Sequence, residues 1–301
     1  MPAPLIIICG PTATGKSDLA VDLALELDGE IINADSMQLY QGMDIGTAKL
    51  PLEQRKGIPH HLLDILSVDE DASVAAYQKI AREKVDQIRG AGKSAIVVGG
   101  TGLYIKSIID EMNFPDTDPA IRARLESEAE EFGSAALFSK LQELDSEAAS
   151  KIDSANTRRV IRALEVIEAT GQPFSANLPS DTSVLYPDAF HFGLTLDREL
   201  LAPRIDARVH RMWESGLVPE VEQLLKLGLR EGTTASRAIG YAQATDFLDG
   251  QCSRGEAIES TITATRQYVR RQETWFKRDK RILWLGAEQS PFNAIVDKLN
   301  S

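Results

Sequence analysis

The sequence predicts an α/β protein with a mostly parallel, doubly wound sheet that an all-helical insertion interrupts. Three observations support this fold class. An apolar run at 4–10 is followed by a glycine-rich turn and a helical pattern. Apolar runs at 30–36 and 94–100 repeat that signature, and each ends in small or polar residues. Strand patterns then stop near residue 113 and return only at 189. Buried parallel strands that alternate with helices are typical of doubly wound sheets.

The first part of the core is the clearest. The run "PLIIICG" at 4–10 is continuously apolar, as expected of a strand covered on both faces. Residues 15–27 carry spaced apolar side chains, which predicts a helix packed against the sheet. "EIINADS" at 30–36 and "SAIVVGG" at 94–100 are the next two strands, with a helical stretch at 72–89 between them.

The middle of the chain is expected to be helical. After "NFPDTDP" at 113–119, two or three amphipathic helices are predicted up to the Gly- and Pro-containing segment at 168–180. The remaining expected elements are a strand at 189–196, helices at 198–216, 218–227 and 256–277, and a last strand at 282–286. We therefore expect a core of residues 1–114 and 190–301 and a helical insertion domain of residues 115–189.

Composition limits the possible function classes. The chain has 301 residues, is 43% hydrophobic and 26% charged, and contains no apolar run near the ~18 residues that a membrane span needs. The apolar run at 5–9 is too short for a signal peptide and has no basic leader, so we expect a cytoplasmic protein that binds no membrane. Two cysteines, Cys9 and Cys252, argue against a disulfide framework. A net charge of −12 means that any surface for nucleic acid must be local.

"GPTATGKS" at 10–17 is the strongest motif. Its spacing, G-x4-G-K-S between a strand and a helix, is that of a loop whose backbone N–H groups surround phosphate. Lys16 supplies a cation and Ser17 a ligand for Mg²⁺. The alternative is a chance match, which the flanking strand and helix disfavour. The expected phosphate-binding residues are Gly10, Pro11, Thr12, Ala13, Thr14, Gly15, Lys16 and Ser17.

The phosphates need not belong to a nucleoside triphosphate. Proteins of this kind that hydrolyse a triphosphate usually have a second strand ending in an acidic residue near Mg²⁺. Here "AIVVGG" ends in glycines, and Asp35 after "IINA" is the nearest acidic residue. Ser36 and Gln38 follow it and suit a polar planar ligand better than a metal alone. Asp35 could also be only a helix N-cap or turn residue.

Six segments together resemble the tRNA dimethylallyltransferases. They are "GPTATGKS", "DSMQLYQGMDIGTAK" (35–49), "PHHLLDI" (59–65), "GGTGLYIKSII" (99–109), "RAIGYAQ" (237–243) and "TRQYVRRQETWFKR" (265–278). The match spans nearly the whole chain in order. One departure is local: Leu50 stands between "GTAK" and Pro51, where the family commonly has proline directly. The chain also has no Cys/His set for the C-terminal zinc finger of eukaryotic relatives.

The resemblance implies a reaction and a set of site residues. The phosphate loop would hold the pyrophosphate of dimethylallyl diphosphate with Mg²⁺, and Lys16 would act on the leaving group. Asp35 would orient and deprotonate the exocyclic amine of the adenosine 3′ to an anticodon, with Thr101 beside it. Thr101 could also be the N-cap of the following helix. Further implied contacts are Asp35, Ser36, Met37, Gln38 and Thr101 to the flipped adenine and its neighbours, Arg122 to tRNA, and Arg208 to pyrophosphate or RNA.

Two arginine-rich segments are candidates for contacts with the tRNA anticodon arm. Residues 262–282 have seven basic and two acidic side chains, with Arg266, Arg270 and Lys277 near one helical face. Residues 156–167 contain Arg158, Arg159 and Arg162. A solvated charged face is the other interpretation of each segment. His60 and His61 are adjacent, point to opposite faces of an extended segment, and are expected to be structural.

The sequence therefore predicts a monomeric, Mg²⁺-dependent enzyme that prenylates tRNA. Two alternatives stay open: prenyl transfer to a free adenine nucleotide, and a small-molecule kinase in which the loop holds ATP and Asp35 activates a hydroxyl. The basic helices and the large insertion favour RNA as the substrate. A non-catalytic RNA-binding module is disfavoured because Lys16 and Ser17 would then have no function.

Overall fold

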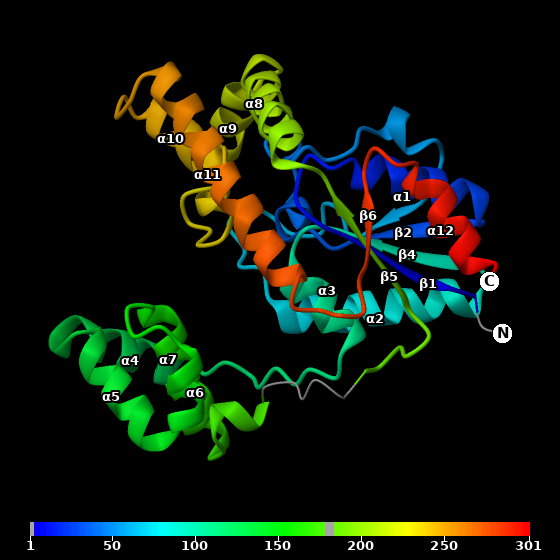
Figure 1. Ribbon diagram of the computed structural model, residues 1–301. Coiled ribbons are helices and arrows are strands. Elements are labelled where there is room, and N and C mark those ends of the chain that lie inside the picture. The colour runs from blue at the N-terminus through cyan, green and yellow to red at the C-terminus, as the bar shows by residue number, and fades with distance from the viewer. Residues whose placement is uncertain (1–2, 178–183) are drawn as a thin grey trace. The chain divides into compact units, whose positions relative to one another are not determined.

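The computed structural model describes residues 3–177 and 184–301 (Figure 1). The chain divides into two compact units: Met1–Ile109 with Tyr186–Ser301, here called unit 1, and Asp110–Leu185, here called unit 2. An isolated antiparallel bridge between Asp110 and Val184 joins the two ends of unit 2. The division therefore falls a few residues ahead of the boundaries expected from the sequence at 114/115 and 189/190.

Unit 1 is built on a parallel sheet. Within the described residues the sheet has six strands in the order β3-β2-β4-β1-β5-β6, and every neighbouring pair is parallel. The strands are β1 (Leu5–Cys9), β2 (Gly29–Asn33), β3 (His60–His61), β4 (Ser94–Val98), β5 (Phe190–Thr195) and β6 (Leu283–Gly286). The α/β class and the mostly parallel sheet predicted from the sequence are confirmed.

Helices cover both faces of this sheet because its central strands are apolar on both sides. Alternate residues of β1 point in opposite directions: Ile6 and Ile8 pack with α1 (Lys16–Glu26) and α12 (Pro291–Leu299), whereas Leu5 and Ile7 pack with α2 (Val74–Gly90) and α3 (Gly102–Ile109). The continuous apolar run of the sequence therefore reflects a strand buried in the middle of three layers (Figure 1).

A second layer of helices extends unit 1 beyond the sheet. It consists of α8 (Arg198–Glu214), α9 (Leu217–Lys226), α10 (Tyr241–Leu248) and α11 (Arg254–Phe276), which share a core around Trp213, Val221 and Tyr241. The sequence predicted α8, α9 and α11 but not α10. That helix has only eight residues, too few to show a helical period, and it begins after Gly240 at a φ of 92°.

Unit 2 is helical throughout its regular part. It contains α4 (Pro119–Phe132), α5 (Ser134–Leu144), α6 (Ser146–Lys151) and α7 (Thr157–Thr170) around a core that includes Leu125, Leu141 and Leu164. The sequence predicted two or three helices here, which is too few for the described part of the unit. Gly133, at a φ of 81°, separates α4 from α5, and the Asp145 carboxylate caps α6 by accepting from the Ala148 N–H.

Short 3₁₀ helices occupy η1 (Ser36–Leu39), η2 (Leu52–Arg55), η3 (Phe174–Asn177) and η4 (Ala235–Arg237). In the part of the chain that the structure describes, no helix is both long and apolar enough to span a bilayer. Because the strands are parallel, the segments that follow β1, β2 and β4 leave the sheet at the same edge, where doubly wound proteins bind their ligands.

Candidate active site

A cavity of about 1230 Å³ lies at this carboxyl edge of the sheet in unit 1. Its walls come from the loop after β1, the end of β2, residues 44–55, the turn after β4, and helix α8. Candidate residues that line it are Thr12, Ala13, Gly15, Lys16, Ser17, Asp35, Gln38 and Arg208. The tertiary structure thus brings these five segments of the sequence together.

The loop at 10–15 has the backbone conformation that a phosphate cradle needs. Gly10 has a φ of 131°, and a Cβ there would lie 2.5 Å from the Leu194 carbonyl oxygen, so only glycine fits. Gly15 has a φ of 83° and leads into α1, whose N-terminal N–H groups favour an anion. The Pro11 carbonyl accepts from Thr14 Oγ1 at 2.9 Å and from Lys16 Nζ at 2.6 Å. The lysine ammonium is therefore held at the loop.

Asp35 stands one residue beyond the Ala34 that follows β2. The Asn33 side-chain oxygen accepts from the Asp35 N–H at 2.9 Å, and Asp35 Oδ1 accepts from the Met37 N–H at 3.0 Å. Asp35 is thus the N-cap of η1, as one interpretation of the sequence proposed, and it also lines the cavity. The cap fixes the direction of the carboxylate, because one oxygen is bonded to the backbone of its own turn.

Lys16, Asp35 and Arg208 influence one another across the cavity. Burial and, after it, the nearby Arg208 lower the pKa of Lys16 to about 8, and Asp35 opposes the change. Burial raises the pKa of Asp35, while Lys16 and Arg208 act in the opposite direction. Burial also lowers the pKa of Arg208. Two cations and one carboxylate in a secluded space leave positive charge for an anionic ligand to neutralise.

Thr101 joins the turn after β4 to the turn after β2. Its hydroxyl accepts from the Ser36 N–H at 3.1 Å and lies 3.4 Å from Ser36 Oγ. Its carbonyl accepts from the Tyr104 and Ile105 N–H groups at the start of α3. Thr101 is therefore at the start of that helix through its backbone, while its hydroxyl is directed to the turn that carries Asp35.

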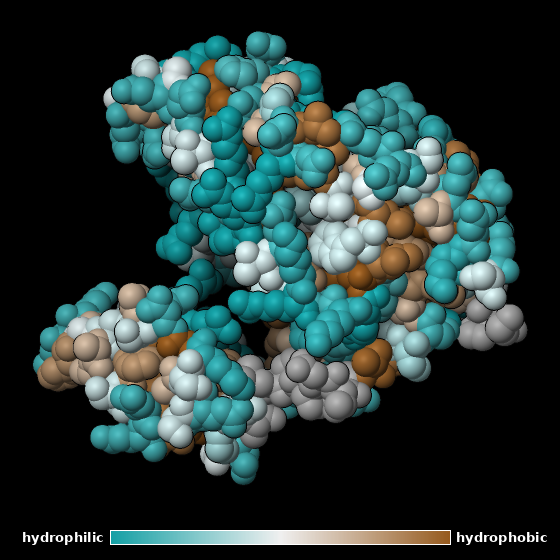
Figure 2. All heavy atoms as spheres, in the orientation of Figure 1, coloured by the Kyte–Doolittle hydropathy of each residue, from teal (hydrophilic) through white to brown (hydrophobic). Residues whose placement is uncertain are grey.

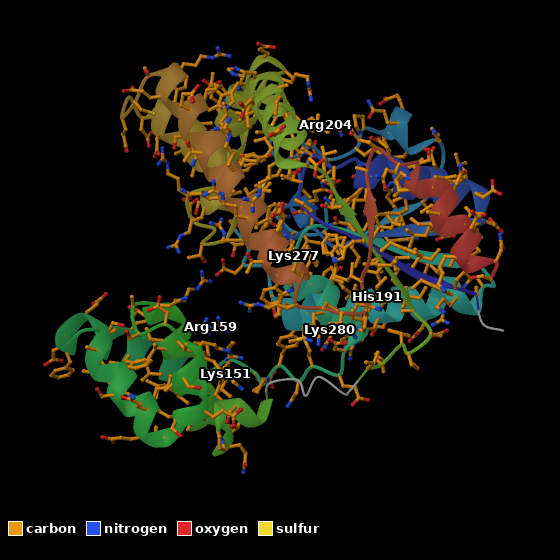
Figure 3. All side chains as sticks on the ribbon, in the orientation of Figure 1. Lys151, Arg159, His191, Arg204, Lys277 and Lys280 are labelled. Carbon is orange, nitrogen blue, oxygen red and sulfur yellow. The ribbon has the colours of Figure 1, made fainter. Side chains whose placement is uncertain are left out.

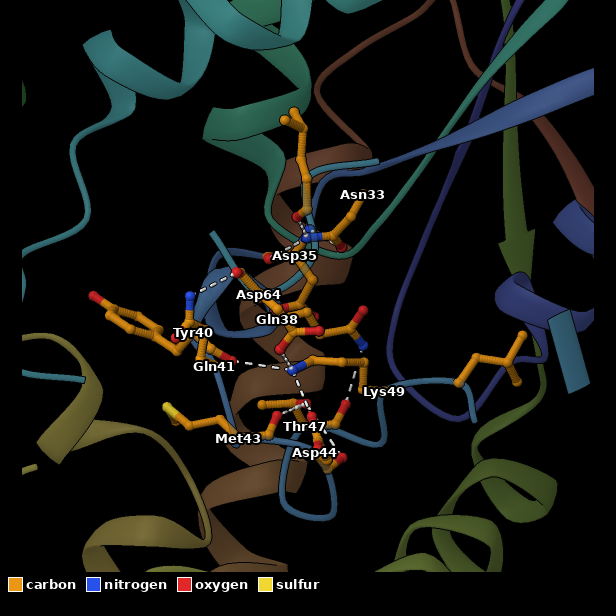
Figure 4. A network of polar contacts seen from close by, with 12 residues as sticks. Asn33, Asp35, Gln38, Tyr40, Gln41, Met43, Asp44, Thr47, Lys49 and Asp64 are labelled. Atoms are coloured by element: carbon orange, nitrogen blue, oxygen red, sulfur yellow. Dashed lines mark hydrogen bonds and ion pairs between the residues drawn. The ribbon is translucent and has the colours of Figure 1, made fainter. Parts of the chain in front are cut away.

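The loop at 40–49 supplies the wall facing η1 (Figure 4). The Thr47 carbonyl accepts from Gln38 Nε2 at 3.2 Å and from Arg208 Nη2 at 3.4 Å. The family resemblance assigns Gln38 and Arg208 to substrate contacts, and the positions of both side chains depend on this one backbone carbonyl.

Sequence reasoning assigned no role to Lys49, which fixes this loop from inside. Its ammonium is nearly inaccessible, with 3% of the side chain exposed, and it donates to the Tyr40 carbonyl at 3.0 Å. It also pairs with Asp44 and Asp64, each at 2.6 Å (Figure 4). A buried charge with two partners and a backbone acceptor is a strong local constraint. The sequence does contain an indication of this role, because Lys49 is the last residue of the motif "MDIGTAK".

Glu220 and Tyr241 hold the same loop from outside. The sequence predicts no role for either, although Tyr241 lies in the segment at 237–243 that carries part of the family resemblance. The Glu220 carboxylate accepts from the N–H groups of Asp44, Ile45 and Gly46 at 2.8 to 3.3 Å, and from the Tyr241 hydroxyl at 2.5 Å. A Cβ at Gly46 would lie 2.3 Å from the Tyr241 ring. Only the fold of α9 and α10 could show that these residues meet the loop.

The arginines of unit 2 fall into two groups. Arg122 and Arg162 both pair with Glu165, a fully buried carboxylate, at 2.6 and 3.1 Å. Arg124, the neighbouring candidate in the sequence, pairs with Glu128 and Glu168. Arg158 and Arg159 are exposed on α7, and no ion pair involves them among the described residues. Arg159 is labelled in Figure 3. Only Arg158 and Arg159 have no acidic partner within the described part of unit 2, while Arg122 and Arg162 share one carboxylate.

Helix α11 has the two faces that the sequence predicted. Ile258, Ile262, Val269 and Phe276 are buried, which confirms the apolar face. On the other face Arg266 is paired with Asp206 at 2.6 Å, whereas Arg270 is exposed with no ion pair to any described residue. Hydrophilic side chains cover this part of unit 1 in Figure 2, and Lys277 lies at the end of the helix in Figure 3.

The two adjacent histidines have structural partners. His61 Nε2 lies 2.7 Å from Glu30, and His60 Nδ1 lies 2.8 Å from the Ile58 carbonyl. The described residues contain no group of three or more His, Cys, Asp or Glu side chains arranged for a metal ion. Ser17 is exposed on the cavity wall at the start of α1. A hydroxyl with few protein ligands around it suits Mg²⁺, which usually keeps several waters and binds through substrate phosphates.

Comparison with known proteins assigns the family. The family model described as "IPP transferase" matches residues 38–279. A tRNA dimethylallyltransferase of Thermobifida fusca is 56% identical over 98% of this chain and 92% of its own length. One of Streptomyces griseus is 55% identical over 94% of this chain and 90% of its own length.

Solved structures agree. A tRNA isopentenylpyrophosphate transferase of Bacillus halodurans has a TM-score of 0.73 and 39% identity, covering 99% of this chain and 95% of that one. A eukaryotic dimethylallyltransferase, described as acting on tRNA, has a TM-score of 0.83 and 28% identity over 99% of this chain and 79% of that one. These similarities extend over nearly the whole chain and agree with the loop at 10–17, Asp35 and Thr101 at one edge of the parallel sheet. This chain therefore belongs to the IPP transferase family.

Proposed function

We propose that this protein transfers a dimethylallyl group from dimethylallyl diphosphate to the exocyclic amine of the adenosine 3′-adjacent to the anticodon of tRNA, and releases pyrophosphate. The observation that carries the proposal is the meeting of Lys16, Asp35 and Arg208 in one cavity. This alkylation requires positive charge that binds the departing pyrophosphate and a carboxylate that accepts a proton. Lys16 and Arg208 supply the first, and Asp35, whose pKa burial raises, supplies the second. The names of the relatives support the choice of donor and acceptor.

The phosphate loop binds the leaving group. As the carbon–oxygen bond of the allylic diphosphate breaks, negative charge grows on the departing pyrophosphate. The N–H groups between Ala13 and Ser17, the Lys16 ammonium and the Arg208 guanidinium bind that charge more tightly as it separates, which lowers the barrier. When diphosphate enters, Lys16 exchanges the Pro11 carbonyl for a phosphate oxygen.

Asp35 handles the nucleophile. The adenine amine forms the new carbon–nitrogen bond and must lose one proton, which passes to the Asp35 carboxylate. Its raised pKa makes it a better proton acceptor than an exposed aspartate. Thr101, whose hydroxyl lies against Ser36 in the turn after β2, orients the adenine. Ser36, Met37 and Gln38 contact the flipped adenine and its neighbours.

Mg²⁺ is the proposed cofactor, and the Ser17 hydroxyl would hold it. It would supply Lewis-acid stabilisation of the leaving group. The exposure of Ser17 on the cavity wall supports this assignment.

The tRNA contacts are proposed on both units. Arg158, Arg159 and Arg270 are exposed and unpaired among the described residues, so they are available to phosphates. Arg122, Arg162 and Arg266 sit in ion pairs, so they contribute less net charge and orient the surface around them. Action as a monomer is part of this proposal.

A labelling experiment tests the proposal. Purified protein is incubated with radiolabelled dimethylallyl diphosphate and Mg²⁺, with either tRNA or AMP as acceptor and without ATP. Label in tRNA is the expected result. Label in AMP alone would replace RNA by a free nucleotide as the substrate. Absence of transfer to both, together with γ-phosphoryl transfer from ATP to a small molecule, would overturn prenyl transfer altogether.

A further inference from the structure

Gln272 on α11 lies between the phosphate loop at 10–17 and the turn after β4 that carries Thr101. Its side-chain amide is buried, with 4% of the residue exposed, and lines the cavity. Its oxygen accepts from the Thr12 N–H at 3.0 Å, and its nitrogen donates to the Gly100 carbonyl at 2.9 Å. One side chain therefore joins the phosphate loop to the turn that carries Thr101.

The first of these bonds fixes a particular peptide. The Thr12 N–H and the Pro11 carbonyl belong to one planar peptide unit and point in opposite directions. Gln272 holds the N–H side, while Thr14 Oγ1 and Lys16 Nζ donate to the carbonyl side at 2.9 and 2.6 Å. Rotation of this peptide would carry away the acceptor that holds Lys16. Before diphosphate enters, the position of the Lys16 ammonium therefore depends on the Gln272 amide, whose oxygen lies 3.0 Å from the Thr12 nitrogen.

The second bond fixes the opposite wall. A Cβ at Gly100 would lie 2.2 Å from Gln272 Nε2, so a glycine at this position is what lets the amide reach the carbonyl. The Tyr268 hydroxyl, one turn earlier on α11, contacts the side chains of both Thr101 and Gln272. The turn that carries Thr101 is thus anchored to α11 at two points.

We propose that Gln272 is a positioning residue for prenyl transfer, which sets the phosphate loop and the Thr101 turn at a fixed separation. This inference rests on the proposed function. The reacting carbon is bonded to the diphosphate on one side and must meet the amine near Asp35 and Thr101 on the other. A small misplacement of the two loops costs about 100-fold in rate. The Gln272 amide supplies one acceptor and one donor in this space at every pH, because it does not ionise.

Three variants test the assignment. Gln272→Met keeps the volume and removes both hydrogen bonds. Gln272→Glu keeps the shape and the acceptor but loses the donor when ionised. Gln267→Met makes the same chemical change on the exposed face of the same helix and is the matched control. The measurements are kcat and KM for dimethylallyl diphosphate, the Kd of inorganic pyrophosphate, the Kd of tRNA, and Tm.

We expect Gln272→Met to lower kcat/KM for the diphosphate about 100-fold and to weaken pyrophosphate binding, with tRNA affinity within about threefold of the wild type. Gln267→Met should behave as wild type. For Gln272→Glu, activity relative to wild type should recover as pH falls, since a protonated carboxyl again donates to the Gly100 carbonyl. Tyr268, Lys16 and Asp35 contact this side chain or line the same cavity and also titrate, so the ratio to wild type is compared at each pH with the same ratio for Gln272→Met, which adds no ionisable group.

The inference is overturned if Gln272→Met retains kcat/KM within about threefold of wild type. It is also overturned if Gln272→Glu stays at one fixed fraction of wild-type activity at every pH, as a residue that only supports folding would give. Failure of the proposed function would look different. The wild type would then transfer no prenyl group, while the effect of Gln272→Met on pyrophosphate affinity would still report whether the amide positions the loop.

Discussion

At the scale of single residues, the cavity places ionisable groups where folding alone would not favour them. Burial raises the pKa of Asp35 and lowers that of Lys16 to about 8, so each group is pushed towards its neutral form. Such opposed shifts are typical of sites where a ligand later supplies the missing charge. Both side chains should therefore destabilise the free protein at neutral pH while serving the reaction.

Replacing Asp35 by Asn separates catalysis from stability. The amide can still cap η1, so the turn should persist, but the base is lost and kcat should fall by about 10² to 10⁴. Pyrophosphate affinity should stay close to wild type. A folded-state pKa above the unfolded one gives stability that is present at low pH and lost as pH rises, so the Tm of the variant should exceed that of wild type at pH 7 more than at pH 4. Unchanged turnover at saturating tRNA would contradict the role of Asp35 as base.

Lys16→Met probes the opposite case. The unfolded chain binds more protons than the folded one between about pH 8 and the ordinary lysine pKa, so wild-type stability should rise over that range relative to the variant. At pH 7 the variant should be the more stable by about 1 to 3 kcal/mol in urea unfolding. Its affinity for pyrophosphate should be much lower and should lack the weakening above pH 8 that wild type shows. Wild-type affinity in the variant would exclude Lys16 from the diphosphate site.

At the scale of elements, the loop at 40–49 is held in place by groups outside it. Lys49 anchors it from below, and Glu220 on α9 accepts three of its N–H groups. The loop in turn presents the Thr47 carbonyl to Gln38 and Arg208. Helix α9, which lies far along the chain, therefore helps to determine the shape of the cavity wall formed by this loop.

Glu220→Gln should loosen this loop, because an amide has one acceptor oxygen where the carboxylate has two. We expect a loss of about 1 to 3 kcal/mol in the free energy of unfolding and a rise in KM for tRNA that exceeds the change in KM for the diphosphate. Glu222→Gln, on the exposed face of the same helix, is the control. Equal effects of the two substitutions on stability and KM would show that Glu220 does not hold the loop.

At the scale of the whole molecule, a protein of net charge −12 must gather positive charge locally to bind RNA. Many of its arginines are already neutralised by internal partners, as with Arg122 and Glu165. The charge available to a polyanion comes from residues such as Arg159 and Arg270. Binding should depend on few contacts and therefore be sensitive to each.

The salt dependence of tRNA affinity tests this distribution. The logarithm of the association constant should fall linearly with the logarithm of salt concentration, with a slope of roughly −0.7 to −0.9 per phosphate contacted. Arg159→Ala and Arg270→Ala should each make that slope shallower by about one such contact. Arg230→Ala removes an exposed arginine that pairs with Asp249 and should leave it unchanged. A salt-independent affinity would argue against phosphate contacts.

Much of the fold followed from local patterns. Continuous apolar runs predicted β1, β2 and β4, and their alternation with helical patterns predicted a parallel sheet, because both signals come from residues adjacent in the chain. The helices α10 and α12 and the division of unit 2 into four described α-helices were missed, since short helices show no clear period.

The sequence by itself determined which motifs the proposed site uses: the loop at 10–17 with Lys16 and Ser17, the aspartate after β2, and the glycine–threonine turn after β4. These are short motifs whose meaning is local. Only the tertiary structure decided which distant residues hold these segments in place, namely Lys49, Glu220 and Gln272. It also decided which arginines form internal ion pairs. A hydrogen bond between residues 12 and 272 leaves no period or spacing in the chain, because the distance between its partners is set by folding alone.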